Sequence, residues 1–175
     1  MIELVPMTPE FVAAVLDGRR DEAAVLMGIE LPEEFPSKGE EGFLGLRLRQ
    51  MREDDRFQTW CPHAVALGGQ MIGHAGYHGP PGVNANDEPD AVEFGYKIFP
   101  PHRGRGYATQ AARMLMDLAA KRAGIRHFVL SVGPYNEPSL AIVRKLGFVK
   151  TGERMDDIDG LELVFELRRT ADGAL

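Results

Sequence analysis

The sequence predicts a mixed α/β domain whose sheet is mostly antiparallel and contains one parallel strand pair. Helical patterns fill the N-terminal part of the chain, and alternating strand patterns dominate from Ala64 onward. A long helical segment, Gly106–Ala123, separates two strand-like segments, and a crossover of this kind joins parallel neighbours. Because no repeat or low-complexity tract marks a second domain, we expect residues 1–175 to form a single domain.

The N-terminal region, residues 1–60, is expected to be mainly helical. Ile2–Val5 predicts a short first strand. Thr8 followed by Pro9 predicts the N-cap and the first position of a helix. The remaining expected elements are a helix over Arg20–Met27 that ends at Gly28, a proline-containing loop over Leu31–Gly39, and a third helix over Phe43–Gln50.

The second region, residues 64–167, is expected to supply most of the sheet. Gly68-Gly69-Gln70 predicts a hairpin turn between strands over Ala64–Leu67 and Met71–His78. After a polar loop over Pro80–Pro89, the expected elements are a strand over Ala91–Phe99, the helix Gly106–Ala123, a strand over His127–Val132, a helix over Glu137–Leu146, and a hairpin of Phe148–Arg154 and Leu161–Leu167 turned at Asp159-Gly160.

Composition excludes several broad classes of protein. Hydrophobic residues make up 44% of the chain and charged residues 26%, and no apolar run approaches the roughly 20 residues of a membrane span. The net charge of −6 argues against nucleic acid as a partner. The N-terminus lacks a basic, apolar signal sequence, and the single cysteine, Cys61, cannot form an internal disulfide. We therefore expect a cytoplasmic protein.

The strongest functional signal lies in the segment Val92–Ala112, where a strand ends at two prolines and a basic, glycine-containing turn leads into a helix. Glycines let a ligand approach the backbone, and the first N–H groups of a helix point outward without intrahelical partners. The turn's arginines add forked donors that suit phosphate. The Walker pattern is missing, and Thr109 stands at the third glycine position of the dinucleotide pattern. The segment predicts a pyrophosphate site of another kind.

Two sequence motifs, in a fixed order along the chain, indicate a protein family. Arg103, Gly106 and Ala108 match R-x-x-G-x-A, and Asn136 begins the segment NEPSLAIVRKLGF, which matches N-x-x-S followed by K-L-G-F. Over roughly Ala64–Leu167 the chain thereby resembles the GNAT superfamily of N-acetyltransferases. Its E-F-G-Y and K-L-G-F segments look most like the branch that acetylates N-termini of ribosomal proteins.

The resemblance implies a fold and a cosubstrate. It implies helices on both faces of the sheet, a splayed central parallel strand pair, and acetyl-CoA bound by residues 64–167 without a metal ion. Substrate-contacting elements are implied for residues 1–60, on the acceptor side. The expected cofactor-binding residues are Ile98 and Phe99 through their N–H groups, Arg103, Gly104, Arg105, Gly106, Tyr107, Ala108, Thr109, Asn136 and Ser139. Two alternatives stay open: Asn136 binds pantetheine or caps the following helix, and Ser139 contacts the cofactor or only backbone and solvent.

Attack by an amine requires loss of a proton. An amine with a pKa near 10.4 is deprotonated at pH 7 at a cost of roughly 4–5 kcal/mol, so a general base is expected. Glu93 is the first candidate because it lies on the strand that leads to the turn, where relatives often carry an acid. His74 and His78 share one face of their strand and are further candidates. For each of the three, a purely structural role is the alternative.

One position departs from the family pattern. Val143 stands where many members carry the tyrosine that protonates the leaving thiolate. Release of an alkyl thiolate at pH 7 forfeits only about 2 kcal/mol, so catalysis remains feasible. The predicted function is therefore acetyl transfer to a primary amine, on a small molecule or a peptide N-terminus. A non-catalytic acyl-CoA sensor and an interaction subunit that dimerises through the terminal hairpin are the alternatives, and monomer and homodimer both stay open.

Overall fold

The computed structural model describes residues 1–156 and 160–170, and the chain divides into two compact units. Unit 1 comprises Met1–Gly76 and Tyr96–Tyr107, and unit 2 comprises Tyr77–Gly95 and the chain from Ala108 onward. Strand β4 (Ala91–Ile98) begins in unit 2 and ends in unit 1. Within the described residues, no helix has both the length and the apolar character needed to cross a membrane.

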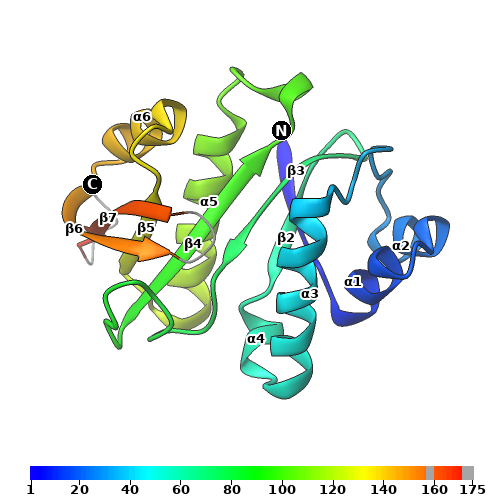
Figure 1. Cartoon of the computed structure of the whole chain (residues 1–175), viewed down its shortest axis with the longest axis horizontal. Coiled ribbons are helices and arrows are strands. Elements are labelled where there is room, and N and C mark those ends of the chain that lie inside the picture. The colour runs from blue at the N-terminus through cyan, green and yellow to red at the C-terminus, as the bar shows by residue number, and fades with distance from the viewer. Residues whose placement is uncertain (157–159, 171–175) are drawn as a thin grey trace. The chain divides into compact units, whose positions relative to one another are not determined.

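Unit 1 is a small antiparallel sheet covered by helices (Figure 1). Its neighbouring strands are β1 (Ile2–Pro6), β2 (Pro62–Leu67) and β3 (Gln70–Tyr77), and its helices are α1 (Pro9–Leu16), α2 (Arg20–Met27), α3 (Lys38–Glu53) and α4 (Arg56–Thr59). Phe11 of α1, Leu44 of α3 and Met71 of β3 belong to one buried cluster. Burial of these side chains holds the helices against the strands.

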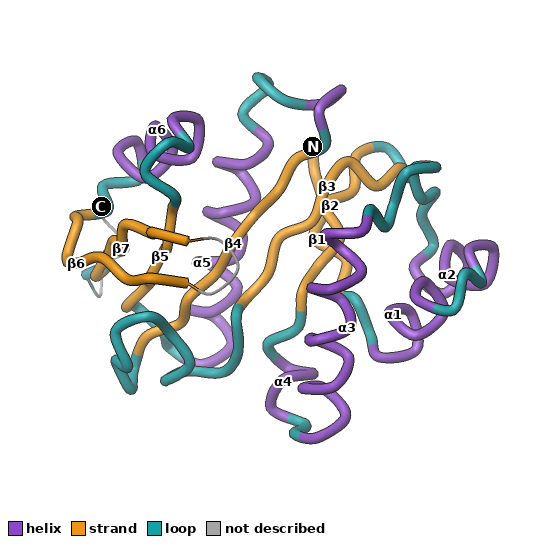
Figure 2. Tube along the Cα trace, in the orientation of Figure 1, coloured by secondary structure: helices purple, strands orange, loops and turns teal. Residues whose placement is uncertain are grey.

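Unit 2 contains strands in the order β4-β5-β7-β6 (Figure 2). Its remaining elements are α5 (Tyr107–Ala123, whose first residue belongs to unit 1), β5 (His127–Val132), α6 (Glu137–Lys145), β6 (Val149–Asp156) and β7 (Gly160–Arg168). The ring of Phe94 lies 6.3 Å from the rings of Phe128 and Phe148, in edge-on contacts that aromatic pairs prefer. Tyr77 donates a hydrogen bond to the carbonyl of Leu115, at 2.6 Å, and so ties α5 to this core.

The strand pairing confirms the predicted fold class. The pairs β1–β2, β2–β3, β5–β7 and β6–β7 are antiparallel, whereas β4–β5 is parallel. The parallel pairing runs only from Ala91 opposite His127 to Glu93 opposite Val129, although both strands continue beyond it. The described parallel register therefore ends at Glu93 and Val129, and the expected splay stays a prediction.

Three local predictions need correction. Lys38 and Gly39 belong to α3 and not to the predicted loop, because Ser37 and Glu40 form a capping box that starts the helix earlier than Phe43. The short helix α4 and a 3₁₀ turn over Pro100–His102 were not predicted. Helix α5 begins at Tyr107, since Gly106 has a positive φ of 79°. Of the predicted hairpin turn, Asp159 lies outside the described residues.

Gly73 permits the close approach of β3 to the end of β4. A Cβ atom at this position would lie 2.2 Å from the carbonyl oxygen of Lys97 and 2.9 Å from the Cα of Ile98. Both contacts are with backbone, which cannot move aside as a flexible side chain can. A side chain at position 73 would therefore push the end of β4 away from β3.

We expect Gly73→Ala to lower the free energy of unfolding by about 1–3 kcal/mol, the range for overpacking a tight site. Urea denaturation followed by the fluorescence of Trp60, the single tryptophan, measures the change in unit 1. Gly42→Ala is the matched control: its Cβ would meet nothing within 4 Å. Since Gly42 lies inside α3, alanine there should stabilise by up to about 1 kcal/mol. Equal unfolding midpoints for the two variants would contradict the packing argument.

Candidate functional site

The basic turn before α5 is open to solvent. Arg103, Gly104, Arg105 and Gly106 are all exposed. Gly104 and Gly106 have φ values of 74° and 79°, a left-handed backbone that glycine adopts without strain. The turn leads directly into Tyr107, where α5 starts, and the first N–H groups of a helix lack intrahelical acceptors. The turn thus has the exposure and backbone shape that an anion site requires.

Arg103 also anchors this turn to the strand before it. Its Nε atom donates a hydrogen bond of 2.8 Å to the carbonyl oxygen of Ile98. The amide of Arg103 donates to the carbonyl of Pro100, at 3.3 Å, in the 3₁₀ turn. Because this hydrogen bond holds Nε, the position of the guanidinium relative to the turn is restricted.

The two amides expected to contact the acyl group differ in their availability. The N–H of Phe99 donates to the carbonyl of Ile72, at 2.9 Å, within unit 1. Strand alternation points the N–H of Ile98 to the opposite side, away from β3. The amide of Phe99 is therefore used within unit 1, and for Ile98 the role of a ligand donor stays a prediction.

A buried charged cluster that the sequence analysis did not predict lies in unit 1. Glu40 accepts hydrogen bonds from the amide of Ser37 at 2.8 Å and from Lys97 Nζ at 2.9 Å, and it lies 3.3 Å from His74 Nε2. Burial raises the pKa of Glu40, but hydrogen bonds from His74, Lys97 and Ser37 outweigh it and hold the pKa far below its ordinary value. The carboxylate is therefore charged. The S-x-x-E capping pattern was the sequence signal for Glu40.

His74, a predicted catalytic candidate, has a fixed ring in this cluster. The ring stacks on Phe43 with centroids 5.5 Å apart and contacts Phe99 edge-on at 6.3 Å. Its side chain is only 15% exposed. The ring is thus packed between two aromatic side chains with Nε2 aimed at Glu40.

A pocket of about 490 Å³ adjoins this cluster within unit 1. Its walls are mainly apolar, and Phe35, Met71, Phe99 and the two prolines at 100 and 101 contribute to them. Glu34, Glu40, Lys97 and Arg103 also line it. The loop wall is held by Arg20, which donates to the carbonyl oxygens of Phe35 and Pro32. The pocket combines an apolar body with a buried carboxylate.

Glu93, the first predicted base, lies in unit 2 and is 1% exposed. Its carboxylate accepts hydrogen bonds from the amide of Ala85 at 2.7 Å and from the hydroxyl of Ser131 at 2.6 Å. His78 Nδ1 lies 3.4 Å from the same carboxylate, and the His78 side chain is 36% exposed. The structure thus brings Glu93 and His78 together, whereas His74 lies with Glu40 in unit 1.

The second motif has a clear structural role. Asn136 caps α6, because its side-chain oxygen accepts a hydrogen bond from the amide of Ser139 at 3.2 Å. The predicted capping role is confirmed, and Asn136 itself is exposed. Val143 of α6 is fully buried. Because valine has no acidic proton, this position offers no acid to a leaving group. Tyr135, beside the cap, is 95% exposed.

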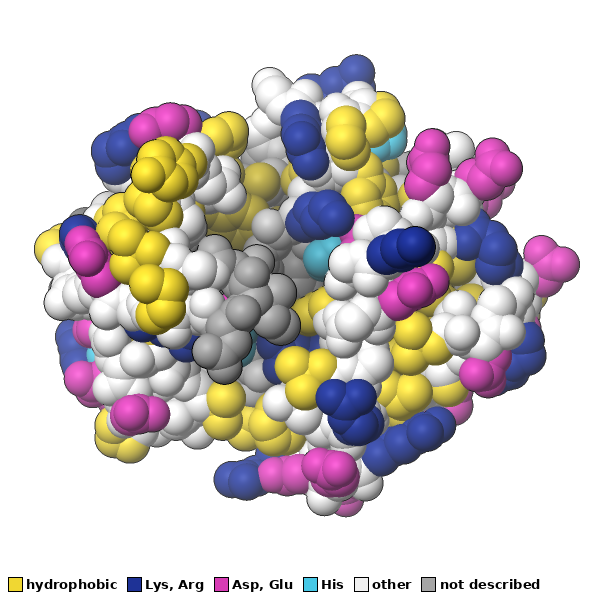
Figure 3. Space-filling model, in the orientation of Figure 1, with side chains coloured by type: hydrophobic (Ala, Val, Ile, Leu, Met, Phe, Trp, Pro, Cys, Tyr) yellow, Lys and Arg dark blue, Asp and Glu magenta, His cyan; other side chains and the backbone are white. Residues whose placement is uncertain are grey.

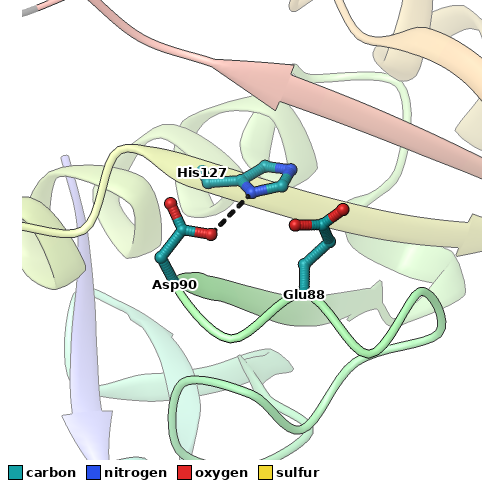
Figure 4. Close-up of side chains that lie close together, drawn as sticks. All are labelled: Glu88, Asp90 and His127. Carbon is teal, nitrogen blue, oxygen red and sulfur yellow. Dashed lines mark hydrogen bonds and ion pairs between the residues drawn. The ribbon is translucent and has the colours of Figure 1, made fainter.

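A further polar cluster in unit 2 joins Glu88, Asp90 and His127 (Figure 4). Their potential ligand atoms lie within 4.8 Å of one another. Arg168, however, already pairs with Glu88 at 3.5 Å and with Asp90 at 3.6 Å. His127 bonds Glu166 at 2.8 Å, and its hydrogen bond to Asp90 lowers the pKa of that carboxyl. We interpret the cluster as an ion network that links β5 and β7 to the loop before β4.

Charge on the surface is mixed in sign. Over α1, α2 and α3, the face in Figure 3 carries acidic and basic side chains side by side. Arg19, for example, pairs with Asp17 at 3.0 Å and with Glu22 at 2.5 Å. The acidic N-terminal segment therefore does not form a uniformly negative surface on this face.

Comparisons with known proteins agree with this geometry. A family model described as acetyltransferase (GNAT) domain matches residues 2–149. Spermidine N(1)-acetyltransferase of Escherichia coli K12 is 36% identical over 75 residues, which make up 43% of this chain and 40% of that enzyme. The match thus covers less than half of this curated relative.

Solved structures share the fold over nearly the whole chain. The ribosomal-protein-S5-alanine acetyltransferase of Vibrio fischeri superposes with a TM-score of 0.62 at 18% identity, over 99% of this chain and 96% of that one. RimJ of Mycobacterium smegmatis, in complex with CoA-disulfide, has a TM-score of 0.63 at 19% identity, over 95% of this chain and 81% of that one. With the family model covering most of its length, the chain belongs to the GNAT acetyltransferase family.

Proposed function

We propose that this protein transfers an acetyl group from acetyl-CoA to a primary amine, on a small molecule or a peptide N-terminus, in the cytoplasm. The observation that carries the proposal is the exposed turn at Arg103–Gly106, whose two left-handed glycines lead from the end of β4 into α5. Such a turn suits the diphosphate of CoA. The names of relatives that act on spermidine or on ribosomal proteins support an amine as the acceptor.

The reaction needs one bond to form and one to break. The neutral amine nitrogen attacks the thioester carbonyl carbon, the carbon–sulfur bond breaks, and its electron pair leaves on sulfur as thiolate. The amide of Ile98, which points away from β3, is the proposed donor to the developing oxyanion. The proton lost by nitrogen must pass to a base.

Glu93 and His78 together form the proposed general base. Glu93 is nearly inaccessible and already accepts from Ala85 and Ser131, so direct contact with an amine is disfavoured. His78 is more exposed, at 36%, and its Nδ1 lies 3.4 Å from the Glu93 carboxylate. We therefore assign His78 as the base and Glu93 as the residue that positions it.

Release of thiol is the direct test of this function. With acetyl-CoA, DTNB and a panel of primary amines, at least one amine should raise the rate of thiol release above the rate without amine. CoA binding without turnover of any amine would instead favour an acyl-CoA-binding module. Val143, which has no transferable proton where many family members carry a tyrosine, is the observation that favours this second function.

Arg103→Ala should weaken CoA binding by about tenfold or more, since a charge-assisted hydrogen bond to phosphate contributes about 1.5–3 kcal/mol. Isothermal titration with CoA measures the dissociation constant. Arg113→Ala is the control, because Arg113 is an exposed arginine of α5 beyond the turn. Equal affinities of the two variants would place the diphosphate elsewhere.

Glu93→Gln should lower kcat by about 100-fold, within the range for general-base catalysis, and leave the CoA dissociation constant unchanged. His78→Ala should cause a similar loss, and the double variant should lose little more, because the two residues act as one unit. The comparison uses steady-state kinetics with the best amine of the panel. Glu153→Gln, an exposed change on β6, is the control. Undiminished kcat in Glu93→Gln would remove this pair from the mechanism.

A further inference from the structure

Lys97 places an ammonium group against a buried carboxylate at the wall of the unit 1 pocket. Its Nζ lies 2.9 Å from Glu40 Oε1. The side chain of Lys97 is 43% exposed, whereas those of Glu40 and His74 are only 6% and 15% exposed. Among the three, Lys97 is therefore the partner that solvent reaches and that can leave most easily.

The carboxylate cannot stay charged without such partners. Glu40 is nearly buried, and an unpaired charge there would be strongly destabilising. Ser37 and His74 are held in place by the helix cap and by the stacked aromatic rings. Lys97, in contrast, ends in a flexible four-carbon stem. The cluster thus has two fixed donors and one exchangeable donor.

A primary alkylammonium has the same chemistry as the head of Lys97: one positive charge and three N–H donors on one tetrahedral nitrogen. Such a group can replace Lys97 on Glu40 and keep the carboxylate paired. Lys97 is 43% exposed, so its ammonium can return to water while the incoming ammonium restores the pairing that the buried carboxylate needs. An incoming ammonium would therefore find a preformed acceptor.

The rest of the pocket indicates what the ammonium is attached to. Phe35, Met71 and Phe99 line it, and the ring centroids of Phe35 and Phe99 are 6.1 Å apart. Beyond Glu40, the ionisable lining consists of Glu34, Lys97, His102 and Arg103, so one further carboxylate faces mostly basic groups. An apolar or aromatic body attached to one amine fits this lining better than a polyamine does.

We propose that this pocket binds the acceptor as a primary ammonium on an apolar or aromatic body, with Glu40 taking the ammonium in place of Lys97. This inference rests on the proposed acetyl transfer and names its acceptor class. Lys97 and Phe99, which flank Ile98 in the chain, both line the pocket. The amine would thereby be held near the end of β4, which carries the proposed oxyanion donor.

The test measures binding directly, with 2-phenylethylamine as probe. CoA replaces acetyl-CoA, so no acetyl group is available for transfer. Calorimetry should show binding to the wild-type chain, and Glu40→Gln should weaken it by about tenfold or more, through loss of a charge-assisted hydrogen bond. Glutamine still completes the capping box, so α3 should keep its start. Glu41→Gln, at the exposed neighbour in α3, is the matched control and should bind the probe as the wild type does.

Lys97→Met gives a second readout that a purely structural Glu40 would not produce. Removal of the internal ammonium should tighten binding of 2-phenylethylamine severalfold, because the probe no longer competes with Lys97. Spermidine should bind more weakly than 2-phenylethylamine to the wild type. Absence of probe binding, equal affinity in Glu40→Gln, or a preference for spermidine would each overturn the inference. Thiol release with other amines, unaffected by Glu40→Gln, would overturn it while leaving acetyl transfer intact.

Discussion

The candidate site depends on the change of hydrogen-bonding partner along β4. At its start, Ala91–Glu93 pair in parallel with β5, and at its end the amide of Phe99 bonds Ile72 of β3. Because parallel pairing stops after Glu93, the outward amide of Ile98 need not be used within the sheet. Gly73 and Arg103 fix this strand end, one by permitting close approach and the other by bonding the carbonyl of Ile98. The proposed ligand donor would thus result from ordinary strand geometry.

Two buried carboxylates are stabilised in different ways, and the difference assigns them different roles. Glu93 accepts from an amide and a hydroxyl, with His78 as its one partly exposed partner in the pairs described above. Glu40 accepts from an amide and two ionisable groups, and one of these, Lys97, is substantially exposed. Glu93 also interacts electrostatically with Arg154, and its contact with His78 suits the positioning of that ring. A carboxylate held by an exchangeable cation suits the binding of a cationic ligand.

Sequence reasoning succeeded where a local pattern determines the structure. Helix α2 and the turn before α5 follow from glycines that adopt a left-handed backbone, and β5 has the predicted bounds His127–Val132. It failed where contacts distant in sequence decide the result. Both the burial of Glu93 and the ion pair of Glu40 with Lys97 depend on residues far apart in the chain. The early start of α3 was missed for another reason: its glycines weaken the helical pattern, and the capping box outweighs them.

The contacts of the acidic residues show that those early in the sequence are not equivalent. Many acids occur early in the sequence, which is compatible with attraction of a cationic substrate by net charge. Several of them are paired at the surface, as Asp17 and Glu22 are with Arg19, and such exposed pairs are screened by solvent and salt. Glu40 differs because it is buried, charged and at a pocket wall. Recognition of an amine in unit 1 would therefore depend on this buried carboxylate in a mainly apolar setting, where low polarity strengthens the interaction.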